Sequence, residues 1–600
     1  MSHSPSRLVD PSMRTVPRSF PLALAVWLAI ATGFLELAFR VGMRYWSGRP
    51  LMAGLDLVWM APASTLIWFG PLGVVMHLAA RRWPERVKPE IVIAVVSFVL
   101  FVSLTWLIPG MHKKAATVLA LGLAVQTGRL SANRFDTIDG WIRRTVKWPV
   151  AALLLALVGV IGGRWALERW RFASLPVVSA PSEGGVPNVL LLILDTVRAQ
   201  NLSLYGYAKP TTPNLEKWAA EGIRFDRTFA TSSWTLPSHA AMFTGRHAHE
   251  LSIVKGKRVM WAAPLDDEYP TLAEAFTRAG YATGGFAANP SYITWEHRLN
   301  RGFIHFEDFI VTIHSFVTGS MIGRIVADNQ RVREFLGRRG LNRKSAAELN
   351  VHVMEWLDKL DDRPFFVMGN YYDAHTPLYV PAPFDSIFGD SGLVPGKRPY
   401  HVSSYDGAIA YLDQQVNLLL SELRGRGLLD KTLVIITSDH GEQWGEHGKI
   451  FHGNSMYRQL LHVPLVMRFP GRIPKGEVVR TPVSLIDLPA TILSMAGLEN
   501  DGRYPGKSLA GQFNGSNTAV YPPILSATSR VPPNSHISLI ASGFHYIRMH
   551  DGREEIYDLD NDPLDSLNLV ATPRGQAALP EIRGILEAMI ASPAAANGNR

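Results

Sequence analysis

Long apolar runs are confined to one part of this 600-residue chain, the stretch between residues 20 and 167. A helix of about 20 apolar residues is long enough to cross a bilayer. We therefore predict a transmembrane domain of five helices over residues 1–173, although its fourth run is short. The first run is too long for a cleaved signal peptide and lacks a clear small-residue cleavage site, so we favour a membrane anchor. The runs are 20–39, 57–80, 91–109, 115–126 and 148–167.

The placement of basic residues predicts an orientation for these helices. Residues 1–174 hold 20 Lys and Arg against 8 Asp and Glu, while the whole chain has a formal net charge of +9. The remainder is therefore slightly acidic, and nucleic acid is not an expected partner. Basic groups precede the first run and follow the second and fourth, which marks these points as cytoplasmic. Everything after Leu167 is then predicted on the outer, periplasmic side of the cytoplasmic membrane. If the fourth run does not cross, the side reverses.

The rest of the chain has the pattern of a soluble α/β protein. Residues 174–187 are rich in Pro, Gly and Ser and are predicted to form a linker. Continuous apolar, strand-like runs then alternate with helix-like runs over 188–524, which predicts a mainly parallel sheet flanked by helices. Residues 310–363 are expected to form a mainly helical insert. Alternating segments over 525–590 predict a small antiparallel sheet, and 591–600 a disordered tail. The chain has no cysteine, so no disulfide contributes.

Polar residues follow the strand-like runs at three places. Asp195 ends the run NVLLLILD, Asp439 and His440 follow LVIIT, and Thr235 precedes the helix-like run AAMFTG. The carboxyl ends of parallel strands meet at one edge of a sheet, so these side chains are expected to lie together. Two carboxylates, an imidazole and a hydroxyl suit a divalent cation, and a hydroxyl beside such an ion becomes a nucleophile. Thr235 would also suit a helix N-cap, which does not exclude that role.

Six segments in fixed order carry a family resemblance between residues 187 and 568. They are NVLLLILDTVR, SSWTLPSHAAMFTG, DAHTPLYVP, TSDHGEQWGEHG, HVPLVMRFPG and EEIYDLDNDPLDSLNL. Together they resemble the sulfatase family of the alkaline phosphatase superfamily. The resemblance implies an α/β fold with a mainly parallel sheet and a small C-terminal antiparallel sheet, here preceded by an α-helical transmembrane bundle. It also implies one divalent metal ion held by Asp195, Thr235, Asp439 and His440.

The chain departs from the sulfatase pattern at the reacting atom. Sulfatases have Cys or Ser, oxidised to formylglycine, where Thr235 stands, and Arg where His239 stands. Oxidation of the secondary alcohol of Thr235 would give a ketone and not an aldehyde. The chain thus resembles the branches with a threonine nucleophile: lipoteichoic acid synthase, phosphoethanolamine transferases and nucleotide pyrophosphatase/phosphodiesterases. Thr196 replaces a second Asp, which shifts the expected metal from calcium toward manganese, zinc or magnesium.

Three histidines are predicted to act on the substrate. His375, in DAHTP, matches the family histidine that contacts the ester or the leaving group, and is a candidate general acid. His452 stands where sulfatases often carry a substrate-binding lysine, and His239 and His452 would donate to the transferred group. The alternative for each is a surface histidine. Asp373 would orient His375 or help form a second metal site; one metal is favoured. Residues expected to support or line the site are Glu442, Glu446, His447, Arg198, Trp234 and Trp444.

Three functions remain open from the sequence. The favoured one is a membrane-anchored, metal-dependent enzyme that hydrolyses or transfers a phosphodiester group of a lipid-linked or envelope substrate. The second is a sulfuric ester hydrolase, which the motif set favours and Thr235 opposes. The third is a non-catalytic membrane binding protein, which the complete set of four metal-site residues makes less favoured.

Overall fold

The chain divides into two compact units, residues 1–169 with 310–342, and residues 170–309 with 343–600. The structure is a computed structural model. It describes residues 15–48, 50–178, 185–251, 253, 263–265, 267–329, 332, 343–360, 362–378, 380–389, 401–513, 522–528 and 535–591. Part of the predicted linker and, from 592 onward, the predicted tail lie outside these residues.

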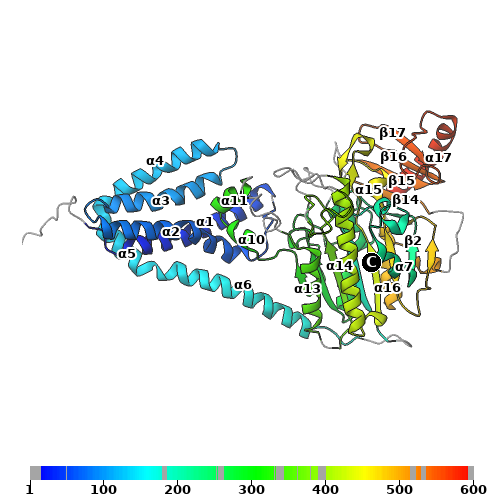
Figure 1. Cartoon of the computed structure of the whole chain (residues 1–600), viewed down its shortest axis with the longest axis horizontal. Coiled ribbons are helices and arrows are strands. Elements are labelled where there is room, and N and C mark those ends of the chain that lie inside the picture. Colours follow the sequence, from blue (N-terminus) through cyan, green and yellow to red (C-terminus); the bar gives the residue numbers. More distant parts are fainter. Residues whose placement is uncertain are drawn as a thin grey trace, which may run out of the picture. The chain divides into compact units, whose positions relative to one another are not determined.

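The first unit is helical, and its long helices are drawn in blue and cyan in Figure 1. Four candidate spans are long and apolar enough to cross a membrane: Phe20–Ser47, Leu57–Arg82, Pro89–Trp106 and Lys113–Ala173. The fourth contains two long helices, α4 and α6, so the expected count of five depends on whether each of them crosses. The helices are α1 (Phe20–Ser47), α2 (Leu57–Arg82), α3 (Pro89–Trp106), α4 (Lys113–Ser131), α5 (Phe135–Thr145) and α6 (Lys147–Ala173).

A segment from the middle of the chain belongs to this helical unit. Helices α10 (Ile313–Val317) and α11 (Met321–Asp328) contact α2 and α3, and Figure 1 shows them beside these helices. The Met321 amide donates to the Glu36 carboxylate at 2.7 Å, and Trp68 Nε1 donates to Ser320 Oγ at 3.0 Å. The insert expected over 310–363 is therefore shared between the two units. These partners lie about 250 or more residues apart in sequence, and no local pattern indicates such pairings.

The second unit is built on an eight-stranded sheet with the order β12-β2-β11-β7-β1-β6-β4-β5. The five strands from β7 to the edge strand β5 pair in parallel. Strand β11 is antiparallel to both of its neighbours, β2 and β7. This confirms the predicted mainly parallel sheet. The strands are β1 (Asn188–Leu194), β2 (Ile223–Phe225), β4 (Ala282–Ala287), β5 (His305–Glu307), β6 (Phe365–Tyr371), β7 (Thr432–Thr437), β11 (Leu465–Arg468) and β12 (Glu477–Val479).

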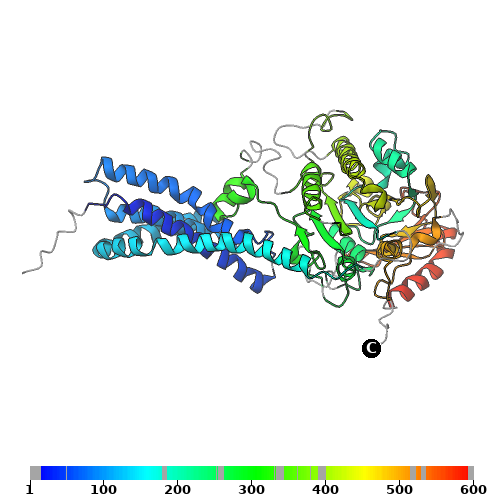
Figure 2. The same cartoon turned by 90° about the horizontal axis from the view of Figure 1, so that it is seen from below.

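Both faces of this sheet are covered by helices, as Figures 1 and 2 show. Successive strand residues point to opposite faces, so alternate residues of β1 enter two separate cores. Because both faces are buried, β1 has the continuous apolar sequence NVLLLIL. One core includes residues of α8 (Thr235–Thr244), α9 (Leu272–Arg278) and α16 (Leu488–Ala496). The other includes residues of α7 (Pro213–Ala220), α13 (Ala346–Leu357) and α14 (Val402–Gly425).

The predicted small antiparallel sheet is present near the C-terminus. It has the order β14-β15-β16-β17 and packs on α17 (Pro573–Ala591). The strands are β14 (Ile524–Ala527), β15 (Ile537–Ala541), β16 (Phe544–Arg548) and β17 (Glu554–Asp558). Its other face joins the main core through side chains that include Ile540 and Tyr557. This subdomain therefore shares a core with the eight-stranded sheet.

Three buried side chains joined by hydrogen bonds also hold this subdomain in place. Ser538 Oγ lies 2.7 Å from His545 Nε2, and His545 Nδ1 lies 2.9 Å from Asp565 Oδ2. Asp565 also accepts from the backbone amide of Arg458, the first residue of α15 (Arg458–Leu461). The order Ser-His-Asp is that of a hydrolytic triad, but all three side chains are at most 1% exposed. No substrate reaches the Ser538 hydroxyl, so these three hydrogen-bonded side chains have a structural role.

Candidate active site

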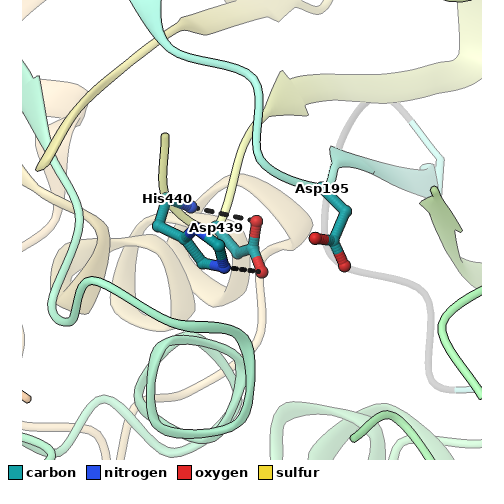
Figure 3. Close-up of side chains that lie close together, drawn as sticks. All are labelled: Asp195, Asp439 and His440. Carbon is teal, nitrogen blue, oxygen red and sulfur yellow. Dashed lines mark hydrogen bonds and ion pairs between the residues drawn. The ribbon is translucent and has the colours of Figure 1, made fainter. Parts of the chain in front are cut away.

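Three of the predicted metal ligands meet at the carboxyl edge of the central sheet. Asp195 directly follows β1, and Asp439 and His440 follow the neighbouring parallel strand β7 after one intervening residue. One ligand atom from each lies within 4.8 Å of the others, and all three residues are fully buried (Figure 3). Among the described residues, this is the one group of three or more acidic or histidine side chains close enough to hold a metal ion.

Two carboxylate oxygens in this group have no hydrogen-bond donor among the described residues. They are Asp195 Oδ1 and Asp439 Oδ2. A buried carboxylate oxygen without a partner is costly, because it has lost water and gained nothing in exchange. A cation bound between the two oxygens would remove that cost. The donor set therefore fits the divalent ion that the sequence predicts.

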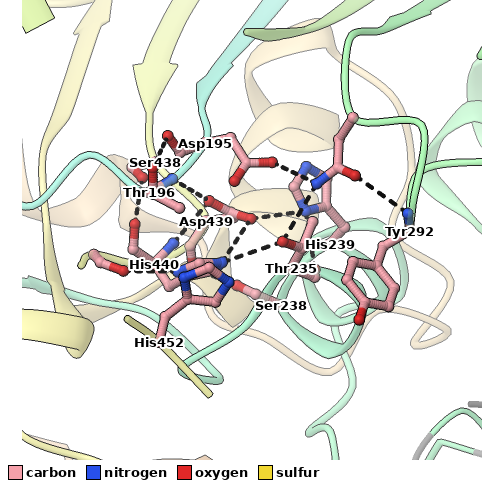
Figure 4. A network of polar contacts seen from close by, with 12 residues as sticks. Asp195, Thr196, Thr235, Ser238, His239, Tyr292, Ser438, Asp439, His440 and His452 are labelled. Atoms are coloured by element: carbon pink, nitrogen blue, oxygen red, sulfur yellow. Dashed lines mark hydrogen bonds and ion pairs between the residues drawn. The ribbon is translucent and has the colours of Figure 1, made fainter. Parts of the chain in front are cut away.

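Thr235 is the first residue of α8, and its hydroxyl faces the same group. Its Oγ1 lies 3.2 Å from His440 Nε2 (Figure 4). The N-cap position of the helix is occupied by Trp234, so the Thr235 hydroxyl is not used as a cap. The N-terminal end of a helix carries a partial positive charge, which favours an anionic oxygen there. The structure thus brings together all four predicted metal-site residues.

Two asparagines that the sequence did not single out complete this arrangement. The Nδ2 atoms of Asn289 and Asn370 donate to Asp195 Oδ2 at 2.9 and 3.2 Å, and Asn289 Nδ2 also lies 3.5 Å from Thr235 Oγ1. The backbone amide of Tyr292 donates to Asn289 Oδ1, which turns the NH₂ group toward Asp195. Asn289 follows the end of β4, so the same strand-end signal that marked Asp195 could have identified it.

The two carboxylates differ in charge because their neighbours differ. Burial and the nearby charge of Asp439 raise the pKa of Asp195 to about 7. Burial opposes ionisation of Asp439 too, but His440 and His239 outweigh it and lower the pKa of Asp439 below its usual value. The amides of Thr196 and His440 donate to Asp439 Oδ1 at 3.2 and 2.9 Å. Without a metal, Asp439 is therefore the carboxylate that ionises more readily, and Asp195 the one that holds a proton more readily.

His440 is held as a neutral ligand. Its Nδ1 donates to the Gly441 carbonyl at 2.8 Å, which leaves a lone pair on the Nε2 atom that faces Thr235 and Asp439. Burial lowers the pKa of His440 to about 4. His239 donates from Nδ1 to the Thr235 carbonyl at 3.0 Å and lies 3.4 Å from Asp439 Oδ2. Its Nε2 is buried and has no partner among the described residues.

The other two predicted histidines lie beside this group and differ in charge. The His452 ring is 4.6 Å from the His440 ring and 5.0 Å from the His375 ring. Burial lowers the pKa of His375 well below its ordinary value, and the neighbouring His452 adds to this. Burial acts against the charge of His452 as well, but Glu442, 3.1 Å from its Nδ1, raises the pKa of His452. His452 is therefore better placed than His375 to hold a proton.

His375 is fixed in position by its neighbours. Arg343 donates to the carbonyls of His375 and Pro377 at 3.0 and 2.6 Å, and the Tyr372 ring stacks on the His375 ring at 4.2 Å. Its role as general acid stays a prediction, since a neutral imidazole donates a hydrogen bond but has no additional proton to transfer. Asp373 accepts from the Ala346 amide at 2.8 Å at the start of α13.

The remaining predicted residues support the loop that follows β7. Arg198 pairs with Glu446 at 2.7 Å and donates to the Glu442 carbonyl at 3.0 Å. His447 stacks on Tyr457, with ring centroids 3.7 Å apart. The predicted residues Trp234, Trp444 and Thr196 also make structural contacts. Trp234 donates to the Thr528 carbonyl, and Trp444 packs on Tyr405. The Thr196 hydroxyl donates to the Asp195 carbonyl.

Comparison with known proteins identifies the second unit. The family model described as "Sulfatase" matches residues 187–498, and the one described as "N-sulphoglucosamine sulphohydrolase, C-terminal" matches residues 445–591. The N-acetylgalactosamine-6-sulfatase of Canis lupus familiaris is 27% identical over 56% of this chain and 67% of its own length. An arylsulfatase of Clostridium perfringens is 23% identical over 67% of this chain and 93% of its own length.

Solved structures show the same fold. The phosphonate monoester hydrolase of Agrobacterium radiobacter matches with a TM-score of 0.51 and 21% identity, over 68% of this chain and 95% of its own. The enzyme BT4656, in complex with its substrate D-glucosamine-2-N,6-O-disulfate, matches with a TM-score of 0.51 and 19% identity, over 69% of this chain and 100% of its own. The "Sulfatase" model alone spans more than half of the chain, which confirms the resemblance, and the chain belongs to the sulfatase family of ester-hydrolysing enzymes.

Proposed function

We propose that this protein is a membrane-anchored, metal-dependent enzyme that hydrolyses or transfers a phosphodiester group through Thr235. The observation that carries the proposal is the position of the Thr235 hydroxyl. It lies 3.2 Å from His440 Nε2, beside two buried carboxylates, at the place where sulfatases carry the residue that becomes formylglycine. Threonine cannot become an aldehyde, but its hydroxyl is a competent nucleophile once its proton is removed.

Four atoms of this site would hold a divalent ion. They are Asp195 Oδ1, Asp439 Oδ2, His440 Nε2 and Thr235 Oγ1. When bound, the ion would lower the pKa of the Thr235 hydroxyl and offset negative charge on the transferred group. The site would supply three oxygen ligands and one nitrogen ligand, and only two of the oxygen ligands are carboxylates. This set favours manganese, zinc or magnesium over calcium.

The reaction would proceed by two displacements. The Thr235 proton is lost to solvent, Thr235 Oγ1 forms a bond to phosphorus, and the bond from phosphorus to the leaving oxygen breaks. That oxygen takes a proton from His452, whose pKa is raised by Glu442. In the second displacement, water or an acceptor hydroxyl bonds to phosphorus, gives its proton to His452, and releases Thr235. His375 and His239 would donate hydrogen bonds to the transferred group.

Sulfuric ester hydrolysis is the second candidate. It is favoured by the curated relatives, which are named as sulfatases, and the same site geometry suits a sulfate group. Thr235 argues against it, because no formylglycine can form there. The phosphonate monoester hydrolase neighbour has the same fold, so the fold alone does not separate sulfur from phosphorus chemistry.

The helical unit is proposed as a multi-pass anchor with the catalytic unit on the outer side of the cytoplasmic membrane. The basic residues Arg81 and Arg82 lie at the C-terminal end of α2, and the positive-inside rule makes that end cytoplasmic. The segment containing α10 contacts the other end of α2, where Trp59 packs on Phe316. The middle of the chain therefore meets the bundle toward the end proposed to be outside. A lipid-linked or envelope substrate follows from this placement.

Thr235→Ala is expected to lower phosphodiester turnover by about a thousandfold or more, because the attacking oxygen is removed. Bis(4-nitrophenyl) phosphate and 4-nitrophenyl sulfate are compared as substrates, and phospho-Thr235 is sought by mass spectrometry after acid quench. Thr235→Ser is the matched control, which keeps a hydroxyl and should keep measurable activity. Sulfatase activity without phosphodiesterase activity, or full activity in Thr235→Ala, would contradict the proposal.

Metal affinity is expected to fall by about tenfold for each pH unit below about 7. The pKa of Asp195 is raised to about 7, so below that pH the ion must displace one proton to bind. Calorimetric titration of the chelated protein with Mn²⁺ between pH 5.5 and 8 measures this slope. Asp195→Asn should bind more weakly and show a smaller slope. A pH-independent affinity in the native protein would show that Asp195 is not a ligand.

The alkaline limit of activity is expected to depend on Glu442. The pKa of His452 is raised, so its proton is present below that pKa and is lost as pH rises through it. Glu442→Gln removes the stabilising charge and should move the alkaline limb of the kcat/KM profile to lower pH. His452→Lys should move it to higher pH. Glu477→Gln, at the exposed first residue of β12, is the control and should leave the profile unchanged. An unshifted limb in Glu442→Gln would remove His452 from the proposed role.

External protease is expected to digest the catalytic unit in intact spheroplasts. The basic end of α2 motivates the outer placement, and an immunoblot against the C-terminus detects the fragment. A cytoplasmic marker protein that stays intact is the control for lysis. Protection of the catalytic unit until the spheroplasts are lysed would place it in the cytoplasm and exclude the five-span arrangement.

A further inference from the structure

A pocket is lined partly by residues of the loop that carries His452. Its volume is about 290 Å³, and its walls are residues of the loop that includes Lys449 and Asn454 and residues of the C-terminal sheet and its β16–β17 turn. Five of the residues that line the pocket are Lys449, Asn454, His536, His550 and Arg553. Nothing in the proposed catalytic steps uses these side chains.

The pocket is rich in cationic and imidazole groups. It is lined by Lys449, Arg553 and two histidines, and no acidic side chain is among the lining residues that the structure describes. Arg553 pairs with Asp551 at 2.7 Å in the exposed β16–β17 turn, while Lys449 has no ion pair among the described residues. Burial lowers the pKa of His536, and the neighbouring His550 and Lys449 lower it further, as expected in a positive environment.

Two buried polar atoms of the lining residues have no hydrogen-bond partner among the described residues. They are His536 Nδ1 and Asn454 Oδ1. His536 is only 9% exposed, and its ring contacts the His550 ring at 5.6 Å. Buried imidazole nitrogens in native proteins are usually hydrogen-bonded. A ligand oxygen that reached His536 would supply the missing partner.

The pocket and the active site share one loop. His452 lies between Lys449 and Asn454, three residues from the first, so their Cα atoms are at most about 11 Å apart. The loop is joined to the segment before the nucleophile, since the Gly453 amide donates to the Ser233 carbonyl at 2.8 Å. A second pocket of about 430 Å³ adjoins the first through Met549 and His550, and its lining includes apolar side chains such as Leu525 and Ile590.

We propose that the pocket formed by Lys449, His536, His550 and Arg553 binds a second anionic group of the same substrate. The substrate class is then an ester whose remainder carries a further phosphate, sulfate or carboxylate, and the loop between the Cα atoms of His452 and Lys449 spans at most about 11 Å. This inference rests on the ester-cleaving function proposed above and specifies its substrate. The adjoining apolar pocket leaves room for the body of the molecule, so the ligand is larger than a free ion.

The first test uses two synthetic aryl phosphodiesters that differ only in a sulfonate at the end of a chain of about 10 Å. The full-length native enzyme should have the higher kcat/KM for the sulfonated ester. Lys449→Gln should lower the ratio of the two kcat/KM values by about tenfold, because one charge-assisted contact is lost. Lys475→Gln, an exposed lysine outside the pocket, is the control and should leave the ratio unchanged. A ratio of one in the native enzyme, or an equal loss in Lys475→Gln, would overturn the proposal.

The second test does not need turnover, so it separates failure of the pocket from failure of the proposed function. Crystals of the full chain are soaked in millimolar selenate, and anomalous scattering locates the anion. We expect a peak beside His536 and Lys449 that is absent in Lys449→Gln. A native enzyme that cleaves neither ester but holds selenate in the pocket would count against the proposed function alone. No selenate peak in the pocket would overturn the inference, whatever the activity.

Discussion

Asp195 and Asp439 are buried side by side, and the surrounding residues are arranged to make that possible. Two carboxylates in a low-dielectric site repel each other, and each has lost its water. Two asparagines donate to one oxygen of Asp195, and two backbone amides donate to one oxygen of Asp439. In each carboxylate the other oxygen is left without a donor among the described residues. The arrangement satisfies the outer oxygens and leaves the inner pair for a cation.

The histidines around these carboxylates differ in pKa because their own surroundings differ. His440, with Nδ1 committed to a backbone carbonyl, stays neutral and offers its other nitrogen to the site. His452 is paired with Glu442 and keeps its proton more readily, whereas His375 has a carbonyl partner and loses it. The pKa values of three imidazoles within a few ångströms thus shift differently because their surroundings and second partners differ. That division suits a site that needs a ligand, a hydrogen-bond donor and a proton donor at once.

The loop after β7 connects this chemistry to the C-terminal subdomain. It carries Glu442 and His452 on the catalytic side and Lys449 and Asn454 on the side of the small sheet. The chain of Ser538, His545 and Asp565 fixes that sheet near Arg458, just beyond the loop. A displaced subdomain would therefore move the loop and the proton-holding histidine with it. The family match over residues 445–591 covers this same stretch.

The sequence by itself determined the sheet architecture and singled out the four polar residues that the structure brings together. The position of a residue at the end of a strand is a local property of the sequence. When an apolar run forms a parallel strand, an Asp or Asp-His that follows the run lies at the carboxyl edge of the sheet. The sequence also located the apolar helices, because length and composition decide whether a helix can span a bilayer. Asn289 was missed, although it has the same strand-end position, because a neutral amide carries no signature of its own.

Only the tertiary structure decided in which direction the pKa of each histidine shifts and where the middle segment packs. The protonation of His452 depends on its contact with Glu442, and that of His375 on its burial, neither of which is visible in residue spacing. The pairing of Met321 with Glu36 joins residues 285 positions apart. The pocket beside Lys449 needs His536 and Arg553 from separate parts of the chain. Contacts between distant residues arise from packing, and local sequence carries no physical record of them.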